Sequence, residues 1–172
     1  MSRADVISPF STPVEPGSVA AGLEASCLVA LSDEELSIHH AIRRAVFVEE
    51  QAFFSETDRD ARDDDPATEK VLALYGRIAG GAVRLYPLDE DGLWKGDRLA
   101  VLSAFRPNGL GAALVRFAVR TAGERGGRLM IAHIQPQNVG FFRRLGWHAE
   151  GVPEDFVGRT HQKMAIRLRP GA

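Results

Sequence analysis

The chain has 172 residues, 45% of them hydrophobic, which is enough to bury one core. Its formal net charge of -2 gives no general attraction to nucleic acid or to an anionic membrane, so an anionic ligand would need a local site. No apolar run is long enough to span a bilayer, and the single cysteine excludes an internal disulfide framework. We therefore expect a cytoplasmic protein, and no Cys/His spacing predicts a metal.

The N-terminal stretch differs from the rest of the chain. Residues 1–22 are rich in Ser, Pro, Gly and Ala and lack periodicity, which predicts a flexible arm before a domain spanning 23–172. Residues 26–31 form a short apolar run suited to a first strand. The next four residues, Ser32 to Glu35, form a capping-box sequence and predict the start of a helix.

This helix carries an apolar stripe through Ile38 and Ile42, consistent with packing on a sheet. His39 and His40 fall beside the stripe, and we expect them at the surface or an edge. The run Arg43 to Gln51 comes next.

Two acidic features follow. Glu50 could take a proton from an amine through water, or it could be a solvated carboxylate at a helix end; the residues leave both open. The stretch from Ser55 to Asp65 holds six acidic residues. Most such runs are solvated, and the alternative is a lid or specificity loop.

A hairpin comes next. Residues 71–75 and 81–86 are short apolar runs separated by a Gly-containing turn at 76–80, which predicts paired antiparallel strands. Residues 89–96 are expected to form a connecting loop in which Trp94 covers the edge of the sheet.

The most informative stretch reads as strand, loop and helix. The apolar run 99–105 predicts a strand, and helical spacing of apolar residues begins at Leu110. The loop between them contains Arg106, Gly109 and Gly111. It can bring bare backbone N–H groups and one guanidinium to a helix N-terminus, where the helix dipole favours an anion. This arrangement predicts a phosphate site.

The helix should run to about Glu124, and residues 129–134 predict the next strand. A strand-helix-strand crossover places that strand parallel to and beside the run 99–105. Asn138 is then expected at the N-cap of a short helix.

Two motifs in this order resemble a known family. The pattern Arg-x-x-Gly-x-Gly over 106–111 resembles the acyl-CoA pyrophosphate loop of the GNAT N-acyltransferases, and residues 138–147 resemble the family's second signature. The resemblance covers roughly residues 23–168. It implies an α/β (α+β) GNAT fold: a mixed, mostly antiparallel sheet of six or seven strands, helices on both faces, and a V-shaped splay between the strands around Val101 and Ile131.

The resemblance also implies a reaction: an acyl group, most often acetyl, moves from acetyl-CoA or another acyl-CoA to a small-molecule amine by direct attack in a ternary complex. A backbone N–H near Val101 or Leu102 would polarise the thioester oxygen. No metal, nucleic acid or membrane is implied, and a homodimer stays open. The implied acyl-CoA contacts are Val101, Leu102, Ser103, Arg106, Asn108, Gly109, Leu110, Gly111, Ala112, Asn138 and Phe142.

An amine, with an ordinary pKa of about 10.4, needs a base or a proton exit at neutral pH. The candidates are Glu50, His133 and His161. His133 near a strand end could equally be structural, and His161 lies in a His-x-x-Met pattern that resembles related subfamilies. Phe142 stands where many GNAT enzymes have a Tyr that protonates the leaving thiolate. CoA would then leave as thiolate, another donor would act, or turnover would be weak.

Shorter runs resemble particular subfamilies. Similarity to a bacterial subfamily encoded in nitrilase-associated gene clusters is carried by residues 94–96, 135–138, 145–147 and 161–164. A Gly-x-x-Arg-Leu resemblance would put Arg84 in the active-site wall, whereas the strand pattern alone would let it face outward.

Two alternatives to an N-acetyltransferase remain. A non-enzymatic acyl-CoA-binding regulator on the same fold is favoured by Phe142. An autoinducer-synthase-like acyltransferase, which would bind S-adenosylmethionine, is suggested by the run 43–51 and the acidic stretch. The intact phosphate-loop motif argues against the second, because a carrier-protein donor would not need it.

Overall fold

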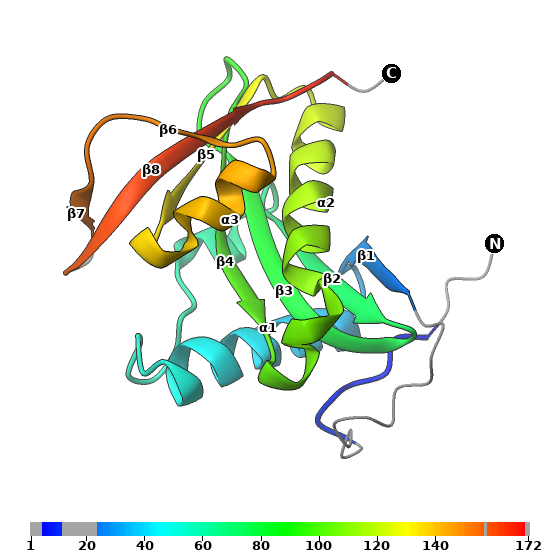
Figure 1. The fold of residues 1–172 in the computed structure, drawn as a ribbon. Coiled ribbons are helices and arrows are strands. Elements are labelled where there is room, and N and C mark those ends of the chain that lie inside the picture. Colours follow the sequence, from blue (N-terminus) through cyan, green and yellow to red (C-terminus); the bar gives the residue numbers. More distant parts are fainter. Residues whose placement is uncertain (1–4, 12–23, 157, 171–172) are drawn as a thin grey trace. The chain divides into compact units, whose positions relative to one another are not determined.

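The computed structural model describes residues 5–11, 24–156 and 158–170 (Figure 1). The chain divides into two compact units. The first unit comprises Met1–Arg84 and Arg98–Val115, and the second comprises Leu85–Asp97 and Arg116–Ala172. Strands β3 and β4 and helix α2 run through both units, which are described one at a time.

The first unit contains a helix, several short helical turns and four strands or parts of strands. In chain order its elements are β1 (Ala25–Val29), α1 (Asp33–Arg44), the π-helical turn η1 (Ala45–Glu50), the 3₁₀ turn η2 (Ala61–Asp64), β2 (Glu69–Tyr75), most of β3 (Ile78–Pro87), the end of β4 (Leu93–Val101), the 3₁₀ turn η3 (Ser103–Asn108) and the start of α2 (Leu110–Glu124). Its strand order is β1-β2-β3-β4.

The predicted hairpin and first strand are confirmed. β1 and β2 are antiparallel, with Ala25 opposite Tyr75. Only Gly76 and Arg77 separate β2 from β3, and Gly76 takes a φ of 62°, so the turn is shorter than predicted. Before β1, Ile7 forms a parallel bridge with Ile78. Its N–H donates to the Arg77 carbonyl at 2.9 Å and its carbonyl accepts from the Ala79 N–H at 3.0 Å.

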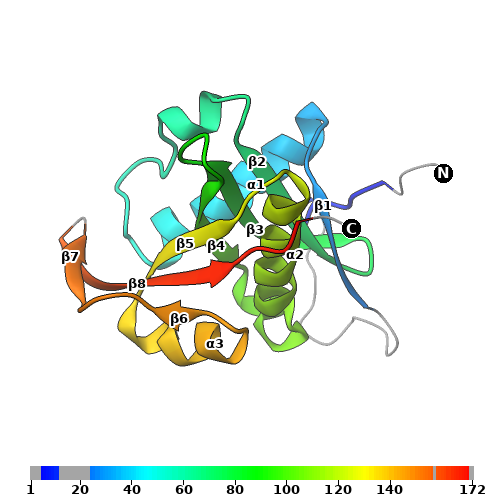
Figure 2. The ribbon, with the colours of Figure 1, turned by 90° about the horizontal axis from the view of Figure 1, so that it is seen from above.

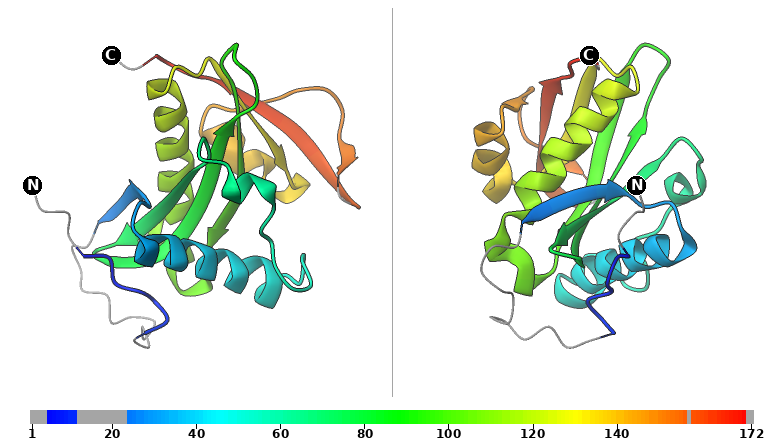
Figure 3. Two further views of the ribbon diagram at one scale, coloured as in Figure 1. Left: turned by 180° about the vertical axis from the view of Figure 1, so that it is seen from behind. Right: turned by 90° about the vertical axis from the view of Figure 1, so that its right-hand side faces the viewer.

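Helix α1 begins as its sequence predicts. The Ser32 hydroxyl accepts from the Glu35 N–H at 3.1 Å, while a Glu35 carboxylate oxygen accepts from the Ser32 N–H at 3.1 Å. Both halves of the capping box are therefore present. The apolar stripe through Ile38 and Ile42 is buried, and α1 packs on β2 (Figure 3).

The predicted bounds of β4 were wrong. The strand runs over Leu93–Val101 instead of 99–105, and the residues that follow form η3. The loop before it is shorter than expected, because the Asp89 carboxylate accepts from the Asp91 and Leu93 N–H groups and closes a tight turn. Trp94 is consequently a buried strand residue and does not cover an edge from a loop.

The second unit contains the parallel pair formed by the start of β4 and the next strand, β5 (Leu129–Ile134). Its complete elements are β5, the 3₁₀ turn η4 (Pro136–Asn138), α3 (Val139–Arg144), β6 (His148–Ala149), β7 (Glu154–Phe156) and β8 (Arg159–Arg167). Its strand order is β3-β4-β5-β8-β6, with β7 on β8. Figure 2 shows α3 beside β6.

The α+β fold class and the mixed, mostly antiparallel sheet are confirmed. β4 and β5 are parallel, pairing Leu93 with Leu129 through Lys95 with Ile131. β5, β6 and β7 each pair antiparallel with β8. Ile131 thus lies opposite Lys95 and not opposite Val101, so the predicted splay would begin beyond Lys95. None of the described helices is long and apolar enough to cross a bilayer.

Candidate functional site

The predicted phosphate loop lies between η3 and α2, within the first unit. Gly109 ends η3 with a φ of 75°, a left-handed conformation that favours glycine. The Ala113 N–H donates to the Gly109 carbonyl at 3.2 Å, which starts the helical bonding of α2. Helix geometry leaves the N–H groups of Leu110 and Gly111 without such partners. A Cβ built on Gly109 would meet nothing within 4 Å, so the space beside the backbone at this residue is open.

Two contacts fix the start of this loop against β3. The Leu102 N–H donates to the Gly80 carbonyl at 2.9 Å, and the Phe105 N–H donates to the Leu102 carbonyl at 2.9 Å. The buried Phe105 ring packs directly on the Gly80 backbone, where a Cβ would overlap it. Since the Leu102 N–H is engaged, Val101 is left as the candidate donor to a thioester oxygen.

Arg106 lies beside a second predicted site residue. Its Nη2 forms an ion pair and hydrogen bond with Oε1 of Glu50, and the two side chains are 46% and 40% exposed. The structure thus joins the predicted phosphate-binding guanidinium to one of the three candidate bases. Glu50 therefore engages a guanidinium N–H group that a phosphate would otherwise compete for.

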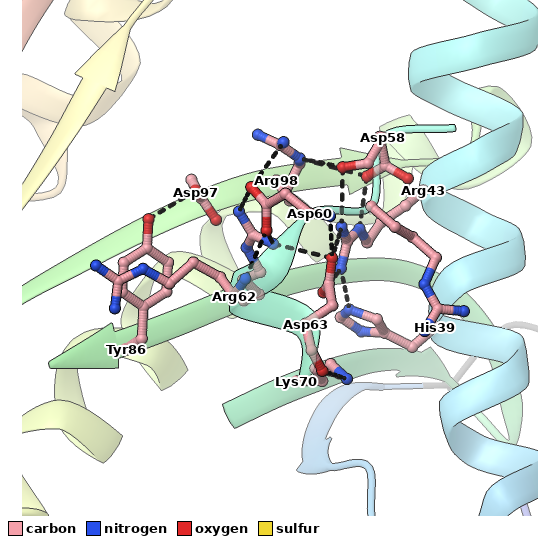
Figure 4. Close-up of polar contacts among 12 residues, drawn as sticks. His39, Arg43, Asp58, Asp60, Arg62, Asp63, Lys70, Tyr86, Asp97 and Arg98 are labelled. Carbon is pink, nitrogen blue, oxygen red and sulfur yellow. Dashed lines mark hydrogen bonds and ion pairs between the residues drawn. The ribbon is translucent and has the colours of Figure 1, made fainter. Parts of the chain in front are cut away.

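The acidic stretch 55–65 is not simply solvated, contrary to the prediction. Asp58 and Asp63 are buried and bind Arg43, a fully buried residue of α1 (Figure 4). The Arg43 Nε lies 2.6 Å from Asp58 Oδ2. Its Nη1 and Nη2 lie 2.6 Å and 3.0 Å from the two oxygens of Asp63, a bidentate pair. These contacts tie the loop to α1.

Two further arginines complete this ionic network. The buried Arg84 of β3 binds Asp60 through Nη1 at 2.6 Å and Nη2 at 3.0 Å, and its Nη1 lies 3.0 Å from Asp63. Arg84 is buried, so the alternative in which it faces outward was wrong. Arg98 contacts Asp58 and Asp60 at 3.4 Å each. The charges of three guanidinium groups are balanced by those of three carboxylates. We refer to these six residues as the ionic network: Arg43, Asp58, Asp60, Asp63, Arg84 and Arg98.

The charges of the network determine its ionisation. Burial opposes the ionised form of Asp63, but the hydrogen bonds and charge of Arg43 outweigh burial and hold its pKa below the usual range. The hydrogen bond from Arg84 lowers the pKa of Asp60. Both carboxylates are ionised at neutral pH.

His39 is buried, so the expectation that it lies at the surface or an edge was wrong. Its Nδ1 lies 3.0 Å from the Val71 carbonyl and its Nε2 lies 3.3 Å from Arg43 Nη1. An arginine can only donate, so Nε2 accepts and Nδ1–H donates to the carbonyl. Burial, with the Arg43 charge, lowers the pKa of His39 well below its usual value, and the ring is neutral.

The other candidate bases belong to the second unit. His133 lies on β5 and the buried His161 on β8. Burial, followed by the charges of Lys95, His161 and Lys163, lowers the pKa of His133, against an opposing contribution from Glu154. A neutral imidazole at pH 7 is the form that a general base requires.

The second signature forms α3 and its aromatic surroundings. Asn138 occupies the predicted N-cap position, and its side chain makes no capping bond there. The Phe142 ring is buried, with edge-to-face contacts to Phe141 at 5.4 Å and Trp147 at 5.3 Å between centroids. The position at which the resemblance implies a tyrosine in many relatives is therefore filled by a packed phenyl ring.

Comparison with known proteins agrees with this architecture. The model of the acetyltransferase (GNAT) family matches residues 32–147. A Bacillus subtilis (strain 168) protein named as an acetyltransferase is 31% identical over 127 residues, which are 73% of this chain and 84% of the relative.

Solved structures share the fold. An N-acetyltransferase structure from Lactobacillus plantarum has a TM-score of 0.74 and 24% identity, covering 84% of this chain and 99% of the other. BjaI, a CoA-dependent acyl-homoserine lactone synthase solved with SAM and isopentyl-CoA, has a TM-score of 0.69 and 20% identity, covering 86% of this chain and 84% of the other. At these identities the likeness shows the fold alone.

Proposed function

The chain belongs to the GNAT family of N-acetyltransferases, whose acyl donor is acyl-CoA, and from that premise we propose that it transfers an acetyl group from acetyl-CoA to a small-molecule amine. The amine would attack the thioester directly in a ternary complex. Direct attack is supported by the absence of any cysteine other than Cys27, which lies on β1.

The observation that carries the donor assignment is the geometry of the phosphate loop. The left-handed Gly109, the open amides at the start of α2 and the nearby Arg106 guanidinium offer one anion several hydrogen-bond donors. The proposed acyl-CoA contacts in this loop extend from Val101 to Ala112. In the second unit, Asn138 and Phe142 remain proposed contacts.

For the acceptor proton we propose His133 first among the three candidates. Its lowered pKa leaves the imidazole neutral at pH 7 and able to accept a proton. Glu50 is held by Arg106, and His161 Nδ1 lies 3.0 Å from the Arg159 carbonyl. Because the Phe142 ring has no proton to donate, we propose that CoA leaves as thiolate, which a thiol pKa of about 8.5 allows.

The setting of the reaction is proposed on sequence resemblance. The short runs shared with the nitrilase-cluster subfamily favour an amine from a specialised metabolic step, met in the cytoplasm. A homodimer is compatible with this proposal and is tested by the mass of the protein in solution.

A second candidate function is synthesis of an acyl-homoserine lactone. The run 43–51 and the acidic stretch suggest it. BjaI, which shares the fold, is CoA-dependent, so a phosphate loop does not argue against such an enzyme. Binding of S-adenosylmethionine, measured by calorimetry, separates this candidate from a transferase for other amines.

The experiment that tests the proposed function combines binding and turnover. Acetyl-CoA is offered with a library of amines, and release of free thiol is followed. Gly109→Glu should abolish acetyl-CoA binding and turnover, because it places a carboxylate where the anion binds. Gly126→Glu is the matched control, since Gly126 also has a positive φ, 89°, and open space at its Cβ position.

Equal acetyl-CoA affinity in both glycine variants would refute the loop assignment. Tight binding by the wild type without thiol release across the library would favour the non-enzymatic regulator.

A further inference from the structure

Arg98 has an unusual backbone for a residue inside a strand. It lies within β4, yet its φ is 54°, in the left-handed region. A residue with a Cβ is disfavoured in this region, so the surroundings must hold this conformation. Ala52 is the only other described residue besides glycines with a positive φ.

The side chain of Arg98 is held by the loop that follows η1. Its Nε donates to the Asp58 carbonyl at 3.1 Å and lies 3.4 Å from Asp58 Oδ2, while Nη2 lies 3.4 Å from Asp60 Oδ2. The guanidinium carbon stands 4.8 Å from the centre of the Phe54 ring, a cation–π contact. With 19% of its side chain exposed, Arg98 is clamped from several directions (Figure 4).

The loop that clamps Arg98 is itself fixed. Asp58 is bound by the buried Arg43 at 2.6 Å, and Asp60 is bound by the buried Arg84. The position of Arg98 is thus tied, through two carboxylates, to α1 and β3.

A second fixed point follows four residues later. The Leu102 N–H is held on the Gly80 carbonyl of β3 at 2.9 Å. The short span Leu99–Val101 therefore runs between a clamped left-handed turn and an anchored amide. Its backbone has little freedom, so the direction of the Val101 N–H is set by these two ends.

We propose that Arg98 is a positioning residue: its clamped left-handed turn orients the backbone N–H at Val101 toward the acyl carbonyl of the donor. This inference rests on the proposed function, because it assigns a role to the segment that leads into the phosphate loop. Arg98 itself does not touch the donor; it acts through the backbone that follows it.

The test uses acetyl-CoA labelled with ¹³C at the carbonyl, bound to the full chain. In the wild type, the hydrogen bond should move the carbonyl resonance downfield from its position in free acetyl-CoA. Arg98→Gly keeps a positive φ accessible but removes the clamp. In this variant, most of the downfield shift of the carbonyl resonance should be lost. The dissociation constant for acetyl-CoA should change by no more than about twofold, because the phosphate loop is unaltered.

Companion variants separate the clamp from the backbone. Arg98→Lys keeps the charge over Phe54 and should recover part of the displacement. Asp60→Asn weakens the clamp without changing β4 and should act in the same direction as Arg98→Gly. Ala52→Gly, at the other positive φ, is the matched control and should leave the resonance in place.

Amide hydrogen exchange gives a readout that needs no ligand. Exchange over residues 99–101 should quicken in Arg98→Gly and Asp60→Asn and stay unchanged in Ala52→Gly. Once an acceptor is known, kcat should fall about 100-fold in Arg98→Gly, with KM for acetyl-CoA nearly constant.

The outcomes are distinguishable. If the wild type fails to bind acetyl-CoA, the proposed function fails, and unchanged exchange in Arg98→Gly overturns the positioning role independently. If the wild type binds but the resonance is the same in Arg98→Gly, or is not displaced at all, the inference alone is overturned.

Discussion

Two arginine–carboxylate contacts in the first unit use the same chemistry in opposite settings. Arg106 and Glu50 form a half-exposed pair next to the open start of α2. Arg43 forms a fully buried pair with Asp58 and a bidentate pair with Asp63. An exposed pair contributes little to stability and can exchange partners, whereas a buried one cannot lose a partner without stranding a charge. The comparison separates a group available to ligands from one that holds the fold.

The largest expected effect comes from removing a carboxylate from the buried ion pairs. Asp63→Ala leaves Arg43 and Arg84 without a shared carboxylate and should lower the free energy of unfolding by about 3–5 kcal/mol. Urea unfolding measures it. The control is Glu49→Ala, which removes an exposed partner 3.8 Å from Arg44 and should cost no more than about 0.5 kcal/mol. Similar losses in both variants would contradict the contrast.

The next prediction concerns the packing of Phe105 on Gly80, which fixes the loop that carries Arg106. Gly80→Ala adds a methyl group into the space of the Phe105 ring and should cost about 1–3 kcal/mol through overpacking. It should also weaken acetyl-CoA binding, because Phe105 lies in η3, the turn that leads to Gly109. Gly140→Ala is the control for stability, since its Cβ would meet nothing nearer than an Arg144 nitrogen at 3.6 Å. Unchanged stability in Gly80→Ala would show that Phe105 moves freely.

A smaller effect is the loss of stability at acidic pH. Burial, followed by the Arg43 charge, lowers the pKa of His39 and brings the pKa of His40 to about 4. Below the ordinary histidine pKa of about 6.5, the unfolded chain binds protons that the folded chain does not. The free energy of unfolding should therefore fall as the pH drops from 7 toward 4. His40→Gln should flatten this slope, as followed by urea midpoints at each pH.

The smallest effect lies at the exposed pair. Glu50→Gln should change stability by no more than about 0.5 kcal/mol. It frees Arg106 from a competing carboxylate, so the affinity for acetyl-CoA should rise about twofold to fivefold, measured by calorimetry. A weaker affinity would mean that Glu50 helps to place Arg106 for the ligand.

The sequence predicted those parts that depend on local signals. The capping box at Ser32 and the apolar stripe through Ile38 and Ile42 each have a short-range cause, and both are as expected. The ionic network joins residues from α1, β3, β4 and the acidic loop, so no local pattern could pair them. A hint was present: Arg43 follows His39 by one helical turn beside an apolar stripe, where a polar pair needs buried partners.

The backbone conformation of Arg98 could not be predicted for a related reason. Arg98 adopts a backbone conformation that its residue type does not favour, and only contacts with distant residues hold it there. From the sequence, the N–H groups of Val101 and Leu102 are equal candidates to donate to the thioester oxygen. In the structure the Leu102 N–H donates to the Gly80 carbonyl instead. Tertiary contacts decided both outcomes.

The bridge between Ile7 and Ile78 bears on how this protein should be prepared for study. A shortened version starting at residue 23 would look reasonable from composition, yet it would strip two backbone hydrogen bonds from the start of β3 and uncover core residues that Val6 now shields. Unpaired strand backbone of that kind promotes self-association. Trimming meant to improve behaviour in solution would therefore worsen it.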